Sequence, residues 1–419
     1  MNTNKTSIQW AEGGVCFPKG FTAHALCAGI KKSSKKEDLA LIVSEVPSRA
    51  SGVFTKNLVQ AEPVKLSRSY LEKEKKAQAI IVNSGNANAC TGSEGAADAG
   101  AMTEATAKAL ASAGYTELSA QDVLIASTGV IGKQMPIEDI LPKIPALVSG
   151  LSKEGNELAR RAIMTTDLVH KEAALSVQIA GKEVRLGTMA KGSGMIHINM
   201  GTMLGFVTSD CNITSELLDE ALKESVLDSY NAVSVDGDTS TNDTLFILAN
   251  GLADNPCIDK KNEDYYVFLD ALKAINIEMA KAIASDGEGA THMLECELRG
   301  ASDKESARNL AKSVISSSLV KAAFFGRDAN WGRILCALGY SGSLFSPEKV
   351  SLSFASEAGE LLVFEKGRPL DFDEDKAKTI LSEKNIRILV DLEDGEASAK
   401  AWGCDLSYDY VKINGDYRT

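Results

Sequence analysis

Apolar and polar positions alternate along the chain with two periods, one typical of strands and one typical of helices. The segment "AQAIIV", with its core at residues 78–82, predicts a buried strand that runs into the turn-rich segment 83–92. An alanine-rich helix is expected next, at about 94–113, with Ser93 as its N-cap and Gly114 at its end. A strand followed by a helix is therefore the first unit that the pattern predicts.

The same pattern recurs downstream and is followed by a change of period. Residues 122–132 predict a short strand that breaks at a Ser-Thr-Gly turn, and helical spacing returns in 137–151 and 156–164. Residues 172–190 alternate on both sides of Ala180-Gly181, which predicts a β-hairpin.

The C-terminal half alternates long amphipathic helices with short strands. Apolar residues recur at helical spacing in 215–230 and 266–284. Strand-like segments, expected to pair antiparallel, are 291–300, 349–355, 360–367, 386–392 and 408–414. Helices packed on sheets in this irregular order predict an α+β fold, a layered helix/sheet sandwich.

Composition narrows the class of protein. The chain has 419 residues, 44% of them apolar and 24% charged, which suits two domains or one large layered core. Its net charge of −12 argues against a general nucleic-acid binder, which needs a basic face. There is no run of 18 apolar residues and no basic-then-apolar N-terminal segment, so we expect neither a membrane span nor a secretory signal. A cytoplasmic protein is the simplest expectation.

Residue spacing argues against a metal, a nucleotide or a disulfide framework. The eight cysteines lie far apart without a C-x-x-C pair, so buried, reduced thiols are expected, and none of the four histidines is paired at ligand spacing. Neither "KGSG" nor "GEGATH" has the spacing of a phosphate-binding loop. Residues 234–244 have acidic side chains at alternate positions, as a calcium loop does, but Thr241 and Ile247 stand where glycine and glutamate are required. We expect a polar turn there, and no metal or cofactor.

The hydroxyl of Thr202, in the uncharged run 192–209, is the main candidate for chemistry. The periodicity of the residues around Thr202 alone favours an ordinary β-branched residue at the start of a strand. A threonine at a chain terminus, however, is a good nucleophile, because its own α-amine, with a pKa of about 8, can act as general base. Thr202 is internal, so this route requires a cut after Gly201. Glycine permits backbone angles that let the hydroxyl reach the Gly201 carbonyl for an N→O acyl shift.

A second segment, "STGVIG" (127–132), is a candidate oxyanion hole for this nucleophile. A strand that breaks at Ser-Thr-Gly can present a hydroxyl and a backbone N–H together, as an oxyanion hole requires. A plain left-handed turn at Gly129 is an equal alternative. Judged from the residues alone, Lys191 belongs to a surface turn and Glu288 is a solvated loop carboxylate.

Eight motifs in order carry a resemblance to a known family. They are "VNSGNANACTG", "STGVIG", "AIMTTD", "KGSGMIHINMGTMLGFVTSDC", "DGDTSTNDT", "DGEGATH", "GRDANWGRI" and "YVKINGDYRT". From about residue 7 to the last residue, the chain resembles the ornithine/glutamate N-acetyltransferases of arginine biosynthesis. The resemblance implies a self-cleaving enzyme whose fragments, 1–201 and 202–419, stay associated, usually as α2β2. It implies acetyl transfer from N-acetylornithine to glutamate through an acetyl-threonine intermediate.

The resemblance also implies roles for particular residues. Thr202 would be the nucleophile after cleavage at Gly201-Thr202, and Thr128 with Gly129 would form the oxyanion hole. The implied substrate contacts are Thr165 or Thr166, Lys191, Thr202, Glu288, Asn414 and Thr419. In this assignment Lys191 neutralises a substrate carboxylate, and Glu288 meets the ammonium of ornithine.

The chain departs from the family pattern beside the cut. The family usually reads "MIAPNMATML" where this chain has "MIHINMGTML", so the scissile bond is Gly-Thr rather than Ala-Thr. His197 and Ile198 replace alanine and proline, which removes a fixed φ and predicts a more flexible precursor loop. We expect the change to affect cleavage more than acetyl transfer.

Two other functions remain open at this point. A self-cleaving aminopeptidase or amidase would use the same nucleophile with water as the final acceptor. A non-catalytic amino-acid-binding protein would keep the pocket without the cut. The sequence also leaves open the use of acetyl-CoA as a second donor, the oligomeric state and feedback by arginine.

Overall fold

Two β-sheets with a long helix between them organise the chain. The computed structural model describes residues 6–31, 35–115, 118–197 and 203–416. The first sheet contains β1 (Gln9–Ala11), β2 (Phe21–Leu26), β3 (Leu39–Phe54), β4 (Lys76–Asn86), β5 (Val123–Val130), β6 (Lys171–Ile179), β7 (Lys182–Lys191), β9 (Leu204–Ser209) and β11 (Thr244–Ala249). Its strand order is β1-β6-β7-β9-β11-β3-β4-β5, and β2 also pairs with β3.

The second sheet is built almost entirely from the C-terminal half. It contains β8 (Ile196–His197), β10 (Val233–Thr239), β12 (Met293–Ala301), β13 (Ser351–Ser356), β14 (Gly359–Glu365), β15 (Arg368–Pro369), β16 (Asn385–Asp391) and β17 (Ala397–Cys404). The strand order is β15-β14-β13-β16-β12-β17-β10-β8. Because β8 and β9 belong to different sheets, the chain crosses from one sheet to the other between residues 197 and 204.

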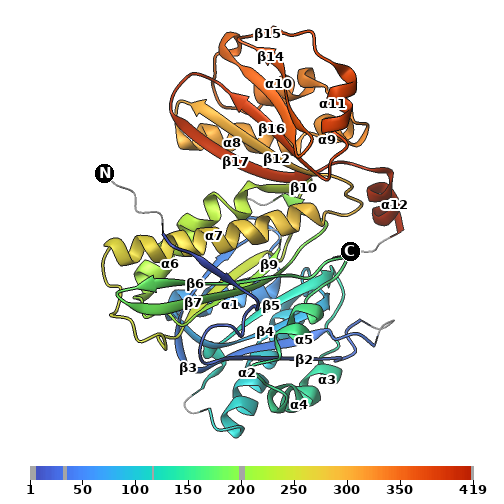
Figure 1. The fold of residues 1–419 in the computed structure, drawn as a ribbon. Helices are drawn as coiled ribbons and strands as arrows, with labels where there is room; N and C mark the ends of the chain where they lie inside the picture. Colours follow the sequence, from blue (N-terminus) through green and yellow to red (C-terminus); the bar gives the residue numbers. More distant parts are fainter. Residues whose placement is uncertain (1–5, 32–34, 116–117, 198–202, 417–419) are drawn as a thin grey trace.

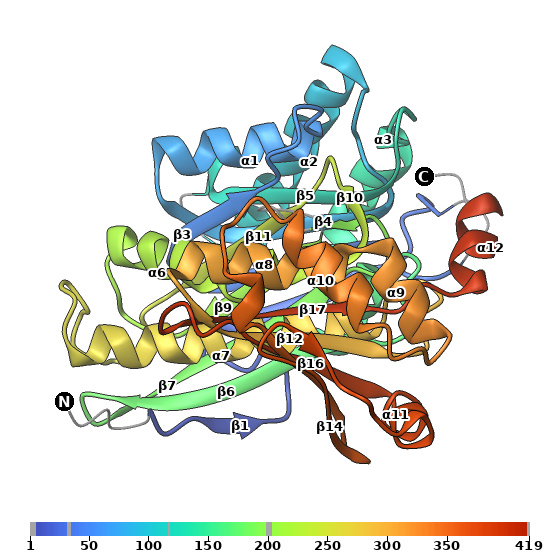
Figure 2. The same cartoon turned by 90° about the horizontal axis from the view of Figure 1, so that it is seen from above.

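Helices cover both sheets. They are α1 (Glu62–Lys73), α2 (Gly92–Ser112), α3 (Ile137–Ile140), α4 (Ile144–Ser149), α5 (Asn156–Ala162), α6 (Ser215–Leu227), α7 (Glu263–Ser285), α8 (Lys304–Ser316), α9 (Ser318–Phe325), α10 (Trp331–Gly339), α11 (Glu374–Ile380) and α12 (Tyr408–Asp416). Helix α7 contacts β6 and β7 of the first sheet and β10 and β17 of the second, and it runs between them in Figure 1. Helices α8, α9 and α10 pack together on the second sheet (Figure 2). The predicted layered α+β fold is confirmed.

The first sheet is apolar on both faces. Ile80 of β4 enters one core layer with Phe206 and Phe246, whereas Ile81 enters another with Met102 of α2. Successive side chains of a strand point to opposite faces, so a strand covered on both sides must be apolar throughout. This explains the apolar run at residues 79–82, within the predicted buried strand.

The predicted hairpin is also present. Strands β6 and β7 pair antiparallel from Lys171↔Ala190 to Ile179↔Lys182. The two turn residues, Ala180 and Gly181, have φ of 49° and 76°. Positive φ at both positions is the signature of the turn whose twist matches that of paired strands.

Four local predictions were wrong. Residues 408–414 lie in helix α12 and not in a strand. The sequence pattern of seven residues was ambiguous, because Tyr410 and Asn414 are also spaced to share one face of a helix. Segment 137–151 is divided into α3, a 3-10 turn and α4, where Pro142 and Pro145 interrupt the regular helix. Ser93 does not cap α2, which already begins at Gly92. Strand β5 does not break at Ser-Thr-Gly but continues to Val130.

Two other expectations hold only in part. The C-terminal strands are not all antiparallel, since β12 pairs antiparallel with β17 but parallel with β16. All eight cysteines are unpaired, but only Cys211, Cys296 and Cys404 are buried. Within the ranges described above, no helix is both long and apolar enough to cross a membrane.

Candidate active site

A cavity of about 340 Å³ gathers the residues that the sequence singled out. Its lining includes Thr128, Gly129, Thr165, Thr166, Lys191, Glu288 and Asn414. Gly201, Thr202 and Thr419 lie outside the described residues, but Met203, which follows Thr202 in the chain, also lines the cavity. Side chains that are far apart in sequence therefore meet at one place, and the roles implied for them remain predictions.

The end of β5 brings Thr128 and Gly129 to the cavity. The parallel ladder between β4 and β5 loses its register here, where Asn86 faces both Thr128 and Val130. Gly129 has φ of 133°, and a Cβ at this position would overlap the backbone of Gly85. Only glycine fits this backbone, and the irregular ladder leaves the Thr128-Gly129 peptide beside the cavity.

Lys191 is the last residue of β7, and its side chain is buried rather than on a surface turn as expected. Its residue exposure is 8%, and Nζ donates a hydrogen bond to Thr128 Oγ1 at 3.3 Å. Burial lowers the pKa of the Lys191 ammonium, while the nearby Asp167 carboxylate raises it. Among the described residues, Lys191 is the only lysine or arginine in the lining, so one cation is available to a substrate carboxylate.

Glu288 is likewise buried, at 7% exposure, so the solvated-loop interpretation is wrong. Asn414 of α12 donates Nδ2–H to Glu288 Oε2 at 2.8 Å, and Glu288 N donates to Ser193 O at 3.1 Å. A Cβ on Gly194 would overlap the Glu288 carboxylate. The small residue at 194 therefore leaves the space that Glu288 occupies at the cavity wall.

The cavity is more acidic than the sequence indicated. Asp236, Asp238 and Asp243 line it together with Glu288. The half-buried Asp236 carboxylate accepts Met195 N–H at 2.6 Å and Ile196 N–H at 2.8 Å, and this partial burial raises its pKa. Four carboxyl groups around one ammonium favour a ligand that carries a positive charge. The polar turn predicted at 234–244 is shorter than expected, because residues 234–239 belong to β10 and Thr244 begins β11, so only 240–243 connect the two strands. The place of this segment in the cavity was missed.

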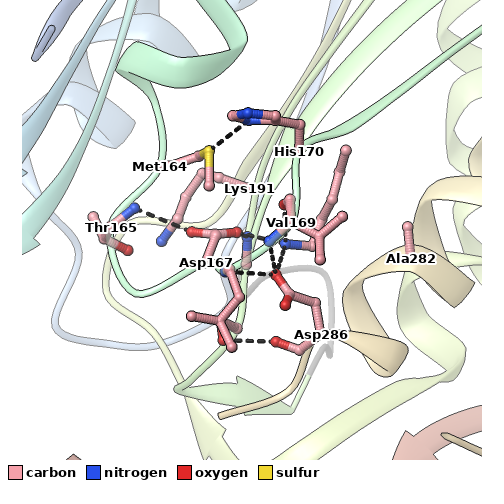
Figure 3. Close-up of polar contacts among 12 residues, drawn as sticks. Met164, Thr165, Asp167, Val169, His170, Lys191, Ala282 and Asp286 are labelled. Carbon is pink, nitrogen blue, oxygen red and sulfur yellow. Dashed lines mark hydrogen bonds and ion pairs between the residues drawn. The ribbon is translucent and has the colours of Figure 1, made fainter. Parts of the chain in front are cut away.

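Thr165 and Thr166 lie on the loop between α5 and β6. Asp167 of the same loop makes the hydrogen bond to Thr165 that is drawn in Figure 3. Asp167 accepts Thr165 N–H at 3.1 Å through Oδ2 and Gly192 N–H at 2.7 Å through Oδ1. Burial alone would raise the pKa of this carboxyl, but the Lys191 and Lys171 ammonium groups lower it to about 2. Asp167 was missed as a site residue, although it ends the motif "AIMTTD".

His197 is the histidine nearest in sequence to Thr202, and it is tied to the second sheet. Its Nδ1 lies 3.1 Å from Ser234 Oγ, and burial together with Lys312 lowers its pKa to about 4. The imidazole is therefore neutral at physiological pH. In the described part of the chain, no three His, Cys, Asp or Glu side chains are grouped as metal ligands.

Comparison with known proteins places the chain among relatives of nearly equal length. A family described as "ArgJ family" matches residues 22–419. The chain belongs to the ArgJ family. The arginine biosynthesis bifunctional protein ArgJ of Symbiobacterium thermophilum is 50% identical over 413 residues, which are 98% of this chain and 100% of the relative. The ArgJ protein of Caldanaerobacter subterraneus subsp. tengcongensis is 49% identical over 408 residues, 97% and 99% of the two chains.

A solved structure from the same family is also similar. The ArgJ crystal structure from Bacillus halodurans is 42% identical, has a TM-score of 0.49, and covers 52% of this chain and 100% of that chain. The family expected from the eight sequence motifs is thus confirmed by whole-chain ArgJ relatives.

Proposed function

We propose that this chain is a glutamate N-acetyltransferase of arginine biosynthesis, which moves an acetyl group from N-acetylornithine to glutamate through an ester on Thr202. The observation that carries the proposal is one cavity that joins the end of β5, the Lys191 ammonium and the Glu288–Asn414 pair. The names of the ArgJ relatives, arginine biosynthesis bifunctional proteins, support the same pathway.

The enzyme first cuts its own chain. Thr202 Oγ attacks the Gly201 carbonyl carbon, the peptide C–N bond breaks, and water hydrolyses the resulting ester. The products are fragment 1–201 with a new carboxylate and fragment 202–419 with a free α-amine on Thr202. That amine is the base the later steps need, because an N-terminal threonine can deprotonate its own hydroxyl.

Acetyl transfer then proceeds in two halves. The Thr202 amine takes the hydroxyl proton, Oγ attacks the acetyl carbonyl carbon of N-acetylornithine, and Thr128 with Gly129 stabilises the oxyanion. The amide C–N bond breaks, and the proton passes to the departing α-amine of ornithine. In the second half, the α-amine of glutamate attacks the acetyl ester, which releases N-acetylglutamate and restores the Thr202 hydroxyl.

The charges of the cavity suit the donor. The substrate α-carboxylate pairs with Lys191, which lies 3.3 Å from Thr128 Oγ1 and so places the neighbouring acetylated amine near the oxyanion pair. The side-chain ammonium of ornithine pairs with Glu288, whose orientation is fixed by Asn414. Thr165 or Thr166 and the C-terminal Thr419 complete the substrate contacts.

The proposal extends to how the enzyme works in the cell. Fragments 1–201 and 202–419 stay together as an α2β2 assembly in the cytoplasm. Acetyl-CoA serves as a second donor, since the same ester on Thr202 can form from any acetyl group that reaches the oxyanion pair.

One mass measurement separates the proposed enzyme from its two rivals. Purified protein incubated with N-acetylornithine alone should show two fragments, with one acetyl group added to fragment 202–419. Glutamate should then remove the adduct as N-acetylglutamate. Rapid loss of the adduct to water, without a need for glutamate, would identify an amidase instead. An uncut chain without an adduct would indicate an amino-acid-binding protein and overturn the proposal.

A further inference from the structure

Three loops that carry residues of the cavity lining meet on a group of buried charges, of which Asp167 and Asp286 are labelled in Figure 3. The group consists of Asp167, Lys171 and Asp286, whose side chains are 0%, 1% and 5% exposed. Lys171 Nζ donates to Asp167 Oδ1 at 2.7 Å and to Asp286 Oδ2 at 2.5 Å. None of the three belongs to the cavity lining, so they act on a substrate only through their neighbours.

Asp167 joins the first loop to the second. It accepts Thr165 N–H from the loop after α5 and Gly192 N–H from the segment after β7. Gly192 follows Lys191 directly. A single carboxylate therefore fixes the backbone on which Thr165 and Lys191 are mounted.

Asp286 joins the first loop to the third. Its Oδ2 accepts Leu168 N–H at 3.1 Å and Val169 N–H at 3.2 Å. Its backbone carbonyl accepts Ser193 Oγ–H at 2.7 Å, and Glu288 N returns a hydrogen bond to Ser193 O at 3.1 Å. The position of Glu288 is thereby tied to the Lys171 charge.

A contribution to the stability of the fold does not by itself account for this buried group of charges. Taking charges out of water costs so much that apolar side chains of similar volume often stabilise a protein equally well or better. Lys171 faces two carboxylates, and Lys191 supplies the second positive charge near Asp167, so the four groups together are neutral. What the charges provide is directional hydrogen bonds to three loops at once.

We propose that Lys171 and Asp286 are positioning residues, which fix Thr165, Lys191 and Glu288 relative to one another so that they bind the two ends of an amino-acid substrate. This inference rests on the proposed function, since it concerns the substrate of the same cavity. Both residues work without touching the substrate.

Asp286→Asn tests the proposal with little change in shape. The amide oxygen can still accept a hydrogen bond, but Lys171 loses one of its two anionic partners. We expect KM for N-acetylornithine to rise about tenfold, because weakened hydrogen bonding to a charged substrate group costs about the 1.4 kcal/mol that corresponds to a tenfold change. The turnover number should change less than KM, as expected when binding is weakened.

Glu295→Gln is the matched control. Glu295 is also a buried carboxylate, bonded to Lys400 Nζ and Trp402 Nε1, both at 2.8 Å, but in the second sheet and outside the cavity lining. It should lower the melting temperature without changing KM. If Asp286→Asn behaves in the same way, the buried charges are only structural and the proposal is wrong.

Two further measurements keep the test decisive. Should Asp286→Asn fail to fold, Ser193→Ala removes only the hydroxyl bond to the Asp286 carbonyl, and we expect KM to rise about threefold. An unchanged KM would overturn the proposal.

Calorimetric titration with L-ornithine separates this inference from the proposed function. Weaker ornithine binding by Asp286→Asn would support positioning even if wild type transferred no acetyl group, and equal or absent binding would contradict it.

Discussion

Lys191 Nζ donates a hydrogen bond to Thr128 Oγ1 over 3.3 Å and so connects the end of β7 to the end of β5. Because the Thr128 oxygen accepts this bond, its own O–H remains available to donate in another direction. A neighbouring ammonium polarises the hydroxyl and makes it a stronger donor. The pair therefore combines the Lys191 ammonium, which can bind a substrate carboxylate, with the Thr128 hydroxyl, which can donate a hydrogen bond to an oxyanion.

Thr128→Ala should lower kcat for acetyl transfer by about 10²–10³, the usual cost of one oxyanion donor, while KM for N-acetylornithine stays nearly constant. Thr128→Ser keeps the hydroxyl and should retain most of the activity. Steady-state kinetics and a melting curve on the same samples distinguish the alternatives. A purely structural threonine would give an unstable variant with normal turnover of the folded fraction.

Glu288→Gln should weaken substrates that contain ornithine without harming the fold. The new amide oxygen can still accept the Asn414 hydrogen bond, but the negative charge is lost. A hydrogen bond to a charged group contributes about 1.5–3 kcal/mol, so KM for N-acetylornithine should rise at least about tenfold. An unchanged KM, measured at saturating glutamate, would remove Glu288 from the substrate site.

Gly194→Ala should reproduce this defect by displacing the carboxylate rather than removing it. The added Cβ would overlap the Glu288 carboxylate, which must then move away from Asn414. Gly100→Ala is the matched control, since a Cβ there in helix α2 meets nothing within 4 Å. We expect the control to have normal KM and a slightly higher melting temperature, because alanine favours a helix by about 1 kcal/mol over glycine. Equal KM values for the two variants would contradict the steric argument.

The sequence predicted those features of the fold whose interacting residues lie close together in the chain. Strand β4 was predictable, because a strand that is buried on both faces has a run of apolar residues. The β6–β7 hairpin was predictable from the alternating pattern on both sides of its two-residue turn. The eight motifs likewise identified the ArgJ family and seven residues of the cavity lining.

Burial of Lys191 and Glu288 could not be predicted from their neighbours in the chain. A buried charge is tolerated only where tertiary structure supplies a partner, and the partners here are Asp167 and Asn414. Lys171 and Asp286 were missed for the same reason, although Asp286 begins the motif "DGEGATH". Helix α12 was read as a strand because a seven-residue pattern without buried contacts carries little information.

Asp167→Asn should destabilise the protein in a manner that depends on pH. The pKa of Asp167 falls from 3.8 to about 2 on folding, so its charged form favours the folded state by about 2 kcal/mol above about pH 4. This contribution is lost as the pH falls from about 4 towards 2. The difference in melting temperature between wild type and variant should therefore be large at pH 7 and shrink below pH 4. Asp371→Asn, at an exposed carboxylate, is the control for the general effect of such a substitution.

The final prediction concerns the cut itself. The described residues that flank the proposed cut have defined contacts on both sides. Upstream, Asp236 accepts Met195 N–H and Ile196 N–H, and downstream β9 begins at Leu204 beside the cavity. Met203, the residue after Thr202 in the chain, lines the same cavity as Thr128 and Gly129, which supports a nucleophile at the start of fragment 202–419.

Wild type should therefore appear as fragments 1–201 and 202–419 that separate only in denaturant. Thr202→Ala removes the hydroxyl, so neither the acyl shift nor the acetyl ester can form, and the chain should stay whole at 44.5 kDa and inactive. Thr202→Ser keeps a hydroxyl but loses the methyl group that restricts χ1, so it should cleave more slowly and retain some activity. Denaturing electrophoresis with intact-mass analysis checks all three proteins. Cleavage of Thr202→Ala at the same bond, or full activity of an uncut wild type, would show that Thr202 is an ordinary residue at the start of a strand.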